Sequence, residues 1–153
     1  MAKESVESRE ERAKNSTSPE ELEKLADDED YYVRSAVAEN TNTPTSLLDK
    51  LAEDKYLRAV VAGNVNMTIP LLENLAEDED YLVREAVARN ANTPVSVLEK
   101  LTEDEDEVVR QRASSNLNSI SLIIDKKVSE EEEDEVVLKQ EPGKTLIKEI
   151  IVY

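Results

Sequence analysis

Leucine pairs spaced three residues apart recur along the chain and mark a repeated short helix. The second leucine of each pair lies 24 or 26 residues after the one before, at Leu25, Leu51, Leu75 and Leu101. Three pairs follow a hydroxyl residue and a proline, at Ser18-Pro19, Thr43-Pro44 and Thr93-Pro94, and in the third unit Thr68 is the expected N-cap before Ile69-Pro70. A hydroxyl N-cap followed by proline is typical of the first turn of a helix. The pattern therefore predicts four short helices, each with a leucine stripe that faces inward.

A second apolar pattern follows each leucine pair, after an acidic loop. Its valine, leucine and alanine residues fall at helical spacing, as in Val33, Ala36 and Val37. Each such segment ends at an asparagine, and these are Asn40, Asn64, Asn90 and Asn116. Asparagine tolerates the left-handed conformation that closes a helix; alternatively, its side chain bonds the backbone of the next layer. The pattern predicts a second helix in every unit.

The paired helices recur with a nearly fixed period, which is typical of a solenoid. We predict an all-α fold, an α-solenoid of about four two-helix repeats over residues 16–128. Residues 1–15 are interpreted as an N-terminal capping helix, in which Asn15 is equivalent to the terminal asparagine of a repeat. A further, fifth copy of the first helix is expected at residues 120–127.

The end of the chain departs from this pattern. Residues 130–135 are consecutive acids, so we expect an acidic linker at residues 129–135. Two β-branched runs then flank Pro142-Gly143, a pair that favours a type II turn. We predict a C-terminal β-hairpin or tail at residues 136–153. Two strands alone are marginal in water, so the hairpin would dock on the last repeat, self-associate through its strands with another chain, or be disordered.

The recurring phrases resemble the leucine-rich repeat variant family. The matching stretches are 42–54, 83–90 and 92–101, where the Thr-Pro start, the leucine spacing and the phrase Val-Arg-x-Ala-Val-Ala-x-Asn occur in order. The resemblance covers roughly residues 15–125. It implies a right-handed superhelix of two-helix layers, in which one of the paired helices can be 3₁₀, and a role in recognition. Family members can carry a cysteine-ligated iron–sulfur module, which does not transfer to a chain without cysteine.

The amino-acid composition excludes several kinds of functional site. The 153 residues include no cysteine and no histidine, which excludes disulfides, thiolate metal sites and the usual general base of neutral pH. We therefore expect no cofactor, no metal and no enzyme activity. No apolar run approaches the ~20 residues that span a bilayer, and the opening residues lack the apolar segment of a secretory signal. We expect a cytoplasmic protein without membrane contact.

The formal net charge of −17 indicates what kind of partner the chain could bind. Nucleic-acid binding needs cations that replace counterions on phosphate, so a basic protein partner fits better. Acidic loops at residues 27–30, 53–54, 77–80 and 103–107 should stack into a negative ridge. The helix macrodipole alone can explain acids at these helix starts. A calcium site is disfavoured because the loops contain no glycine and no Asp-x-Asp-x-Asp pattern.

Two sets of side chains are candidate binding residues. One set shares a single register of the repeat and comprises Arg34, Arg58, Arg84 and Arg110. Each lies four residues after an aspartate (Asp30, Asp54, Asp80 or Asp106), a spacing that favours ion pairs on a helix. These arginines could grip a partner's carboxylates or phosphates, but we favour an internal ion-pair ladder that holds the layers in register. The other set lies at the starts of the second helices and comprises Tyr31, Tyr32, Tyr56 and Tyr81; it is either a binding row or a cover for the loops.

We therefore interpret the chain as a non-catalytic protein-interaction scaffold that presents a curved helical-repeat surface with an acidic ridge. The alternative is an acidic nucleic-acid mimic that occupies the basic groove of a DNA-binding protein. The regular spacing of the acidic loops motivates this alternative, which predicts strongly salt-dependent binding that DNA competes away.

Overall fold

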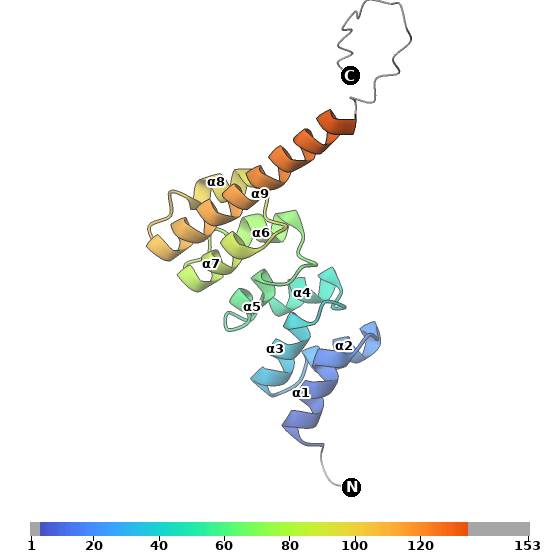
Figure 1. Ribbon diagram of the computed structural model, residues 1–153. Coiled ribbons are helices and arrows are strands. Elements are labelled where there is room, and N and C mark those ends of the chain that lie inside the picture. Colours follow the sequence, from blue (N-terminus) through green and yellow to red (C-terminus); the bar gives the residue numbers. More distant parts are fainter. Residues whose placement is uncertain (1–3, 135–153) are drawn as a thin grey trace, which may run out of the picture. The chain divides into compact units, whose positions relative to one another are not determined.

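The computed structural model describes residues 4–134 and, over residues 129–134, the helical backbone alone. The described elements are α1 (Val6–Asn15), α2 (Pro19–Ala26), α3 (Tyr31–Glu39), α4 (Thr45–Leu51), α5 (Arg58–Ala62), α6 (Ile69–Leu75), α7 (Tyr81–Arg89), α8 (Val95–Leu101) and α9 (Glu107–Asp134) (Figure 1). The chain divides into two compact units, Met1–Ser119 and Ile120–Tyr153, and α9 belongs to both. The predicted all-α fold is confirmed for the described residues. The hairpin or tail at residues 136–153, with its predicted self-association, lies outside them.

Within the first unit the helices form two-helix layers. The first helices of the layers, called A helices below, are α2, α4, α6 and α8. The second helices, called B helices, are α3, α5, α7 and the part of α9 that precedes residue 120. The packing runs in chain order, from α1 against α3 to α3 against α5 and α5 against α7. The helical-repeat architecture is thus confirmed, and every described A and B helix is α rather than 3₁₀. The right-handed sense of the solenoid stays a prediction.

The core of this unit is a set of aliphatic side chains that each layer supplies in the same register. On the A helices the buried side chains include Leu22, Leu48, Leu72 and Leu98. Their counterparts on the B helices are Val33, Leu57, Val83 and Val109. Full burial of one such side chain contributes about 1.5–3 kcal/mol. One layer offers only a few of them, so each layer depends on its neighbours for stability.

The predicted N-caps are right in two layers and wrong in two. Ser18 and Thr68 cap α2 and α6, because their hydroxyl oxygens accept from the backbone N–H groups of Glu21 and Leu71. Thr43 and Thr93 do not cap α4 and α8, which begin after Pro44 and Pro94 without a side-chain cap. The hydroxyl groups of these buried threonines instead donate to the carbonyl oxygens of Val37 and Val87, both at 2.6 Å. Each threonine therefore ties the start of an A helix to the preceding B helix.

The terminal asparagines of the B helices join one layer to the layer before it. The amide of Asn90 donates to the carbonyl oxygens of Ala62 and Asn64 at 2.7 and 2.9 Å. Equivalent pairs of bonds are made by Asn40, Asn64 and Asn116. We call these four residues the asparagine ladder. The expected left-handed cap is wrong for Asn40 and Asn90, whose backbone is extended, and the alternative of bonds between layers is right, although they reach the preceding layer.

At the N-terminal end, α1 takes the place of a B helix beside α3. Arg9 bonds the loop that follows α2 through Asp28, as the arginines of the later layers bond their next loops. The position equivalent to the terminal asparagine belongs to Ser16 rather than Asn15, because the carbonyl of Ser16 accepts from the amide of Asn40. Asn15 is exposed and bonds only within its own helix, to Glu11.

The C-terminal end differs from the prediction. A break was expected after Asn116, followed by a separate helix at residues 120–127 and a linker at 129–135. Instead α9 runs unbroken from Glu107 to Asp134. The reason is local: the layers that fold back carry Pro44, Pro70 or Pro94 near the start of the A helix, whereas this segment has Ile120 and contains no proline or glycine that would end the helix.

Candidate functional site

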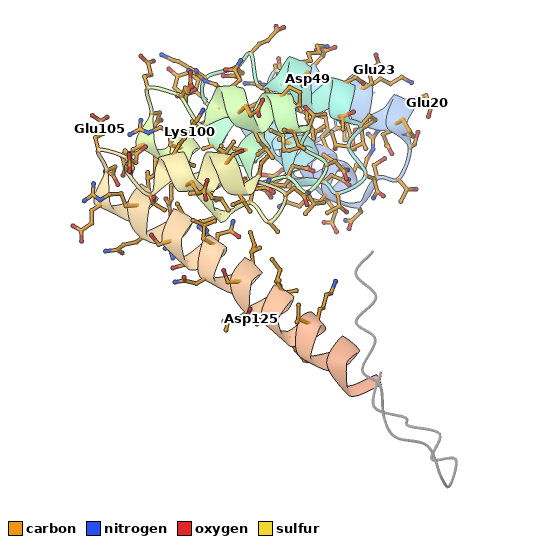
Figure 2. The ribbon with its side chains drawn as sticks, turned by 90° about the horizontal axis from the view of Figure 1, so that it is seen from above. Glu20, Glu23, Asp49, Lys100, Glu105 and Asp125 are labelled. Atoms are coloured by element: carbon orange, nitrogen blue, oxygen red, sulfur yellow. The ribbon has the colours of Figure 1, made fainter. Side chains whose placement is uncertain are left out.

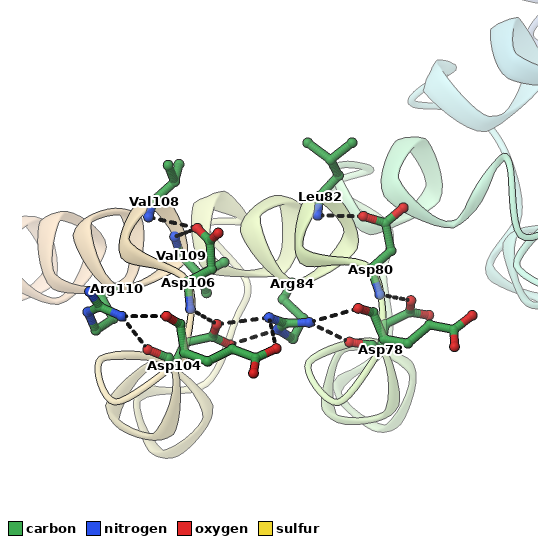
Figure 3. A network of polar contacts seen from close by, with 11 residues as sticks. Asp78, Asp80, Leu82, Arg84, Asp104, Asp106, Val108, Val109 and Arg110 are labelled. Carbon is green, nitrogen blue, oxygen red and sulfur yellow. Dashed lines mark hydrogen bonds and ion pairs between the residues drawn. The ribbon is translucent and has the colours of Figure 1, made fainter.

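The arginines of the B helices connect consecutive acidic loops (Figure 3). Nε and Nη2 of Arg84 donate to the carboxylate of Asp104 in the following loop at 2.7 and 3.0 Å. Its Nη1 donates to the carbonyl oxygens of Asp78 and Glu79 in its own loop at 2.8 and 3.2 Å. One side chain thus holds two loops at a fixed separation.

Arg34 repeats this arrangement in full, since its Nη1 also donates to the carbonyl oxygens of Asp28 and Glu29 in its own loop, and the other arginines repeat part of it. Arg34 bonds Asp54 at 3.1 Å and Arg58 bonds Asp78 at 2.6 Å. Arg110 donates to the carbonyl oxygens of Asp104 and Glu105 in its own loop. Among the described residues no carboxylate contacts Arg110, because α9 continues to Asp134 where the earlier layers turn into their next A helix and loop. The predicted internal ladder is therefore what the contacts form, and these arginines are engaged within the chain rather than presented to a partner.

The predicted pairs within a helix are wrong. The aspartates four residues before the arginines act as N-caps, because Asp30, Asp80 and Asp106 accept from the backbone N–H groups of Tyr32, Leu82 and Val108. In the shortened second loop Asp54 lies at the ladder position instead, and α5 starts without a side-chain cap. An N-cap aspartate must turn back toward its own backbone, which leaves the arginine to the following loop.

The best-enclosed pair of the ladder is Arg84 with Asp104, whose side chains are 8% and 7% exposed. The bond from Arg84 lowers the pKa of the Asp104 carboxyl below its usual range, and the backbone N–H of Asp106 adds to this effect. The same bond raises the pKa of the Arg84 guanidinium. The pair is therefore ionised over the whole physiological pH range.

A pH dependence of stability follows from the Asp104 shift. An unfolded aspartate has a pKa near ~3.9, and the folded pKa is lower, so the stabilisation is complete above about pH 4 and is lost as the pH falls through the folded value. We expect the free energy of unfolding of the wild type to exceed that of Asp104→Asn at pH 7, and the difference to shrink toward pH 3. Urea titrations followed by circular dichroism measure it. Asp49→Asn, at an exposed position, is the control and should show no such convergence; a difference that stays constant in Asp104→Asn contradicts the prediction.

Unlike the ladder arginines, the tyrosines are exposed to solvent. Tyr31, Tyr32, Tyr56 and Tyr81, which we call the aromatic row, are 38%, 65%, 68% and 44% exposed. They lie at the start of α3, just before α5 and at the start of α7. The rings of Tyr31 and Tyr32 meet edge to face, with centroids 5.5 Å apart. Tyr32 and Tyr56 are more than half exposed and Tyr31 and Tyr81 less than half, so the binding row and the cover for the loops both stay predictions.

Sequence reasoning missed two members of this surface. Leu82 and Val108 are exposed at the position that Tyr32 and Tyr56 hold in their layers, eight residues before the terminal asparagine. The apolar character of this outward position in all four layers was the available signal. An apolar residue thus lies beside the acidic loop in every layer, and exposed apolar sets of this kind mark interaction sites.

Carboxylates surround the aromatic row. A surface cavity of about 390 Å³ next to the ring of Tyr81 is lined by Glu79, Asp80, Tyr81, Arg84, Glu105 and Asp106. In the shortened loop the ammonium group of Lys55 lies 4.9 Å from the centroid of the Tyr56 ring. Acids also point outward elsewhere on the unit, as Figure 2 shows for Glu20, Glu23 and Asp49 on α2 and α4.

Other kinds of site were sought in the part of the chain that the structure describes. There, no group of three or more acids could hold a metal ion. No helix between residues 4 and 134 is both long and apolar enough to cross a membrane.

The comparisons with known proteins concern one stretch, from α7 of the third layer to the loop after α8 of the fourth. Residues 81–106 match the sequence model of a family described as Leucine rich repeat variant. No curated protein and no solved structure was found to match the chain. The matched stretch comprises α7, α8 and the loop that carries Asp104. Residues 81–106 are thus similar to a leucine rich repeat variant repeat, and they lie within the helical repeats of the described chain.

Proposed function

We propose that this protein is a non-catalytic interaction scaffold whose aromatic row and acidic loops bind a basic segment of a partner protein. The observation that carries the proposal is the aromatic row: its tyrosines are exposed, Tyr32 and Tyr56 by more than half, at the starts of the B helices of consecutive layers. Tyrosine at the centre of an interface supplies a large contact area with few rotatable bonds. The absence of histidine and cysteine supports a role without catalysis.

The arginine ladder gives this surface its rigidity. Arg34 and Arg84 each bond two consecutive loops, and Arg58 bonds the loop that follows it through Asp78. The tyrosines lie at or just before the starts of the helices that follow these loops. A surface that is already ordered loses little conformational entropy on binding. The arginines therefore act by positioning the binding surface, and the tyrosines and outward-facing carboxylates make the contacts.

The cavity beside Tyr81 indicates the chemistry of the partner. Four of its six lining residues are acids and one is a tyrosine, a combination that suits a lysine or arginine side chain. A cation over a tyrosine ring gains about 0.5–2 kcal/mol, and Lys55 over Tyr56 is an internal example of the same contact. A basic segment could place one cation in the space between two loops and its apolar groups on the row.

The main test removes one ring from each of three layers. Tyr31→Ala, Tyr56→Ala and Tyr81→Ala combined should weaken binding at least about 30-fold, since buried tyrosine anchors contribute about 2 kcal/mol or more in sum. Affinity purification from the source cell with mass spectrometry identifies partners, and titration of the recovered partner measures the change in Kd.

The matched control changes three exposed apolar residues of the same unit that lie outside the row, Val65→Ala, Ile69→Ala and Val95→Ala. It should bind as the wild type does. If the tyrosine variant recovers the same partners with unchanged Kd, the row is not the binding surface.

The nucleic-acid mimic is the competing proposal, and the ion pairs bear against it. Carboxylates at the ladder positions, among them Asp54, Asp78 and Asp104, are neutralised by arginines of the chain, so they are poor substitutes for phosphate. Binding by a scaffold should survive an excess of duplex DNA, whereas DNA should displace a mimic from its partner. Titrations with and without DNA decide between them.

A further inference from the structure

The turns between α3 and α4, between α5 and α6 and between α7 and α8 (Figure 1) carry no charge. Residues 40–48, 64–72 and 90–98, which we call the uncharged edge, contain no lysine, arginine, aspartate or glutamate, although these four types make up 36% of the chain. The acidic loops lie at the other ends of the B helices, about 13 Å away along the nine residues of α3 or α7. Each layer therefore has one acidic end and one uncharged end.

The uncharged edge exposes apolar side chains in two neighbouring layers. Ile69 and Val95, which are 54% and 46% exposed, each hold the first position of an A helix, in α6 and α8. Val65, in the turn before α6, is 55% exposed. We call these three residues the edge patch. The second layer has Thr41 and Thr45 at the positions of Val65 and Ile69, so the patch is confined to the third and fourth layers.

A second set of asparagines bonds the turns of this edge to one another. The side-chain amide of Asn66 donates to the carbonyl oxygens of Thr41 and Thr43 in the preceding turn at 2.6 and 3.2 Å. The amide of Asn92 donates to the carbonyl oxygen of Val65. The edge patch is therefore ordered before any contact is made, and an ordered surface loses little conformational entropy on binding.

We propose that the edge patch binds the edge patch of a second copy of this chain about a two-fold axis. A net charge of −17 opposes the approach of two copies wherever acids line the contact, and the uncharged edge is free of them. A basic partner would gain no ion pair on this edge, whereas a second copy brings a surface that is equally uncharged and apolar. Contact between the two removes exposed apolar area from water.

The positions of Ile69 and Val95 fit a two-fold contact. An axis between the third and fourth layers exchanges the two layers, so Ile69 of one chain meets Val95 of the other, and the contact occurs twice. Packed helices lie about 8–10 Å apart, so the two copies of Ile69 stay at least about 8 Å from each other. The exposed acids Glu73 and Glu99 follow one turn later on the same helix faces, and they leave some repulsion between the copies.

The test measures self-association of the full chain by sedimentation equilibrium from about 1 to 200 µM, a range that brackets micromolar dissociation constants. The wild type should form a dimer, and Ile69→Glu with Val95→Glu should raise the Kd at least about tenfold. Acids in the first turn of a helix are favoured by the macrodipole, so circular dichroism should show this variant folded.

The matched control is Leu82→Glu with Val108→Glu, which adds the same charge near the starts of α7 and α9. These two residues are 47% and 40% exposed, and they lie at the acidic ends of their layers. The control should dimerise as the wild type does. None of the edge-patch residues belongs to the aromatic row or to the acidic loops, so this contact is independent of the proposed function.

The response to salt gives a second readout. The wild-type Kd should fall between about 0.05 and 0.5 M salt, because screening weakens the repulsion between two acidic chains. A wild type that is monomeric throughout, a dimer that the Ile69 and Val95 changes weaken no more than the control does, or a Kd that rises with salt would overturn the proposal.

Disulfide trapping tests the two-fold arrangement. The chain contains no cysteine, so the single variants Ile69→Cys and Val95→Cys each carry one thiol. Oxidation of an equal mixture should join residue 69 of one chain to residue 95 of the other in preference to the 69–69 and 95–95 products, because a disulfide needs Cα atoms about 4.4–6.8 Å apart. Equal yields of the three products, or the same yield from Leu82→Cys mixed with Val108→Cys, would contradict this arrangement.

Discussion

Arg84→Met should lower the free energy of unfolding by about 3 kcal/mol, because it leaves the carboxylate of Asp104 enclosed and unpaired. Both side chains are more than nine-tenths shielded from solvent, and Arg84 also bonds two carbonyl oxygens of its own loop. Domains of this size have total stabilities of about 5–15 kcal/mol, so the loss should be plain in urea titrations at pH 7.

A control and a double variant separate this effect from a general loss of charge. Arg89→Met, on the same helix, removes an exposed arginine whose nearest carboxylate oxygen, on Glu85, is 3.8 Å away; it should change stability by less than about 0.5 kcal/mol. Arg84→Met with Asp104→Leu should recover most of the loss, since no buried charge remains. A loss below about 1 kcal/mol in Arg84→Met alone would mean that solvent screens the pair.

Asn90→Ala should destabilise the protein by about 2–4 kcal/mol, because two carbonyl oxygens of the preceding layer lose their donor in a buried place. These are the carbonyls of Ala62 and Asn64, and Asn90 itself is only 6% exposed. Asn90→Asp should lower the free energy of unfolding more than Asn90→Ala does at neutral pH, since a carboxylate of the same shape would face two carbonyl oxygens. Urea titrations measure both variants.

Asn74→Ala provides the comparison for this experiment. Asn74 lies on the exposed side of α6, and alanine has the higher helix propensity, so stability should stay the same or rise slightly. If Asn90→Ala falls within about 0.5 kcal/mol of the wild type, water replaces the amide and the asparagine ladder contributes little.

The repeat architecture could be predicted because its signals are local. Leucine spacing, proline starts and acidic loops recur in a fixed order, and the helices follow from each of them separately. The partners of the arginines could not be predicted in the same way. Asp80 and Asp104 are both acids near Arg84. Asp80 accepts from the backbone N–H of Leu82, and this explains why Arg84 pairs with Asp104, which is more distant in the sequence.

The structure of the last repeat was also not predicted from the sequence. Within residues 118–128, Ile123 and Ile124 keep two apolar positions of an A helix, and Lys127 replaces the third, that of the buried Leu51. The segment also has Ile120 in place of proline, and α9 continues through it. The aromatic row was easier to predict, because all of its tyrosines lie at the starts of the B helices. Their exposure depends on how far each ring projects beyond the loop, and the sequence pattern holds no information about that.

The two ladders point in opposite directions along the chain. Arg34, Arg58 and Arg84 each reach forward to an aspartate one layer ahead, and each asparagine of the ladder reaches back to carbonyls one layer behind. Each of these donors therefore finds its acceptor at a constant offset in the repeat. A duplicated segment of one period would meet ready-made partners on both sides, so this chain can grow or shrink by whole units during evolution without a new interface having to be invented.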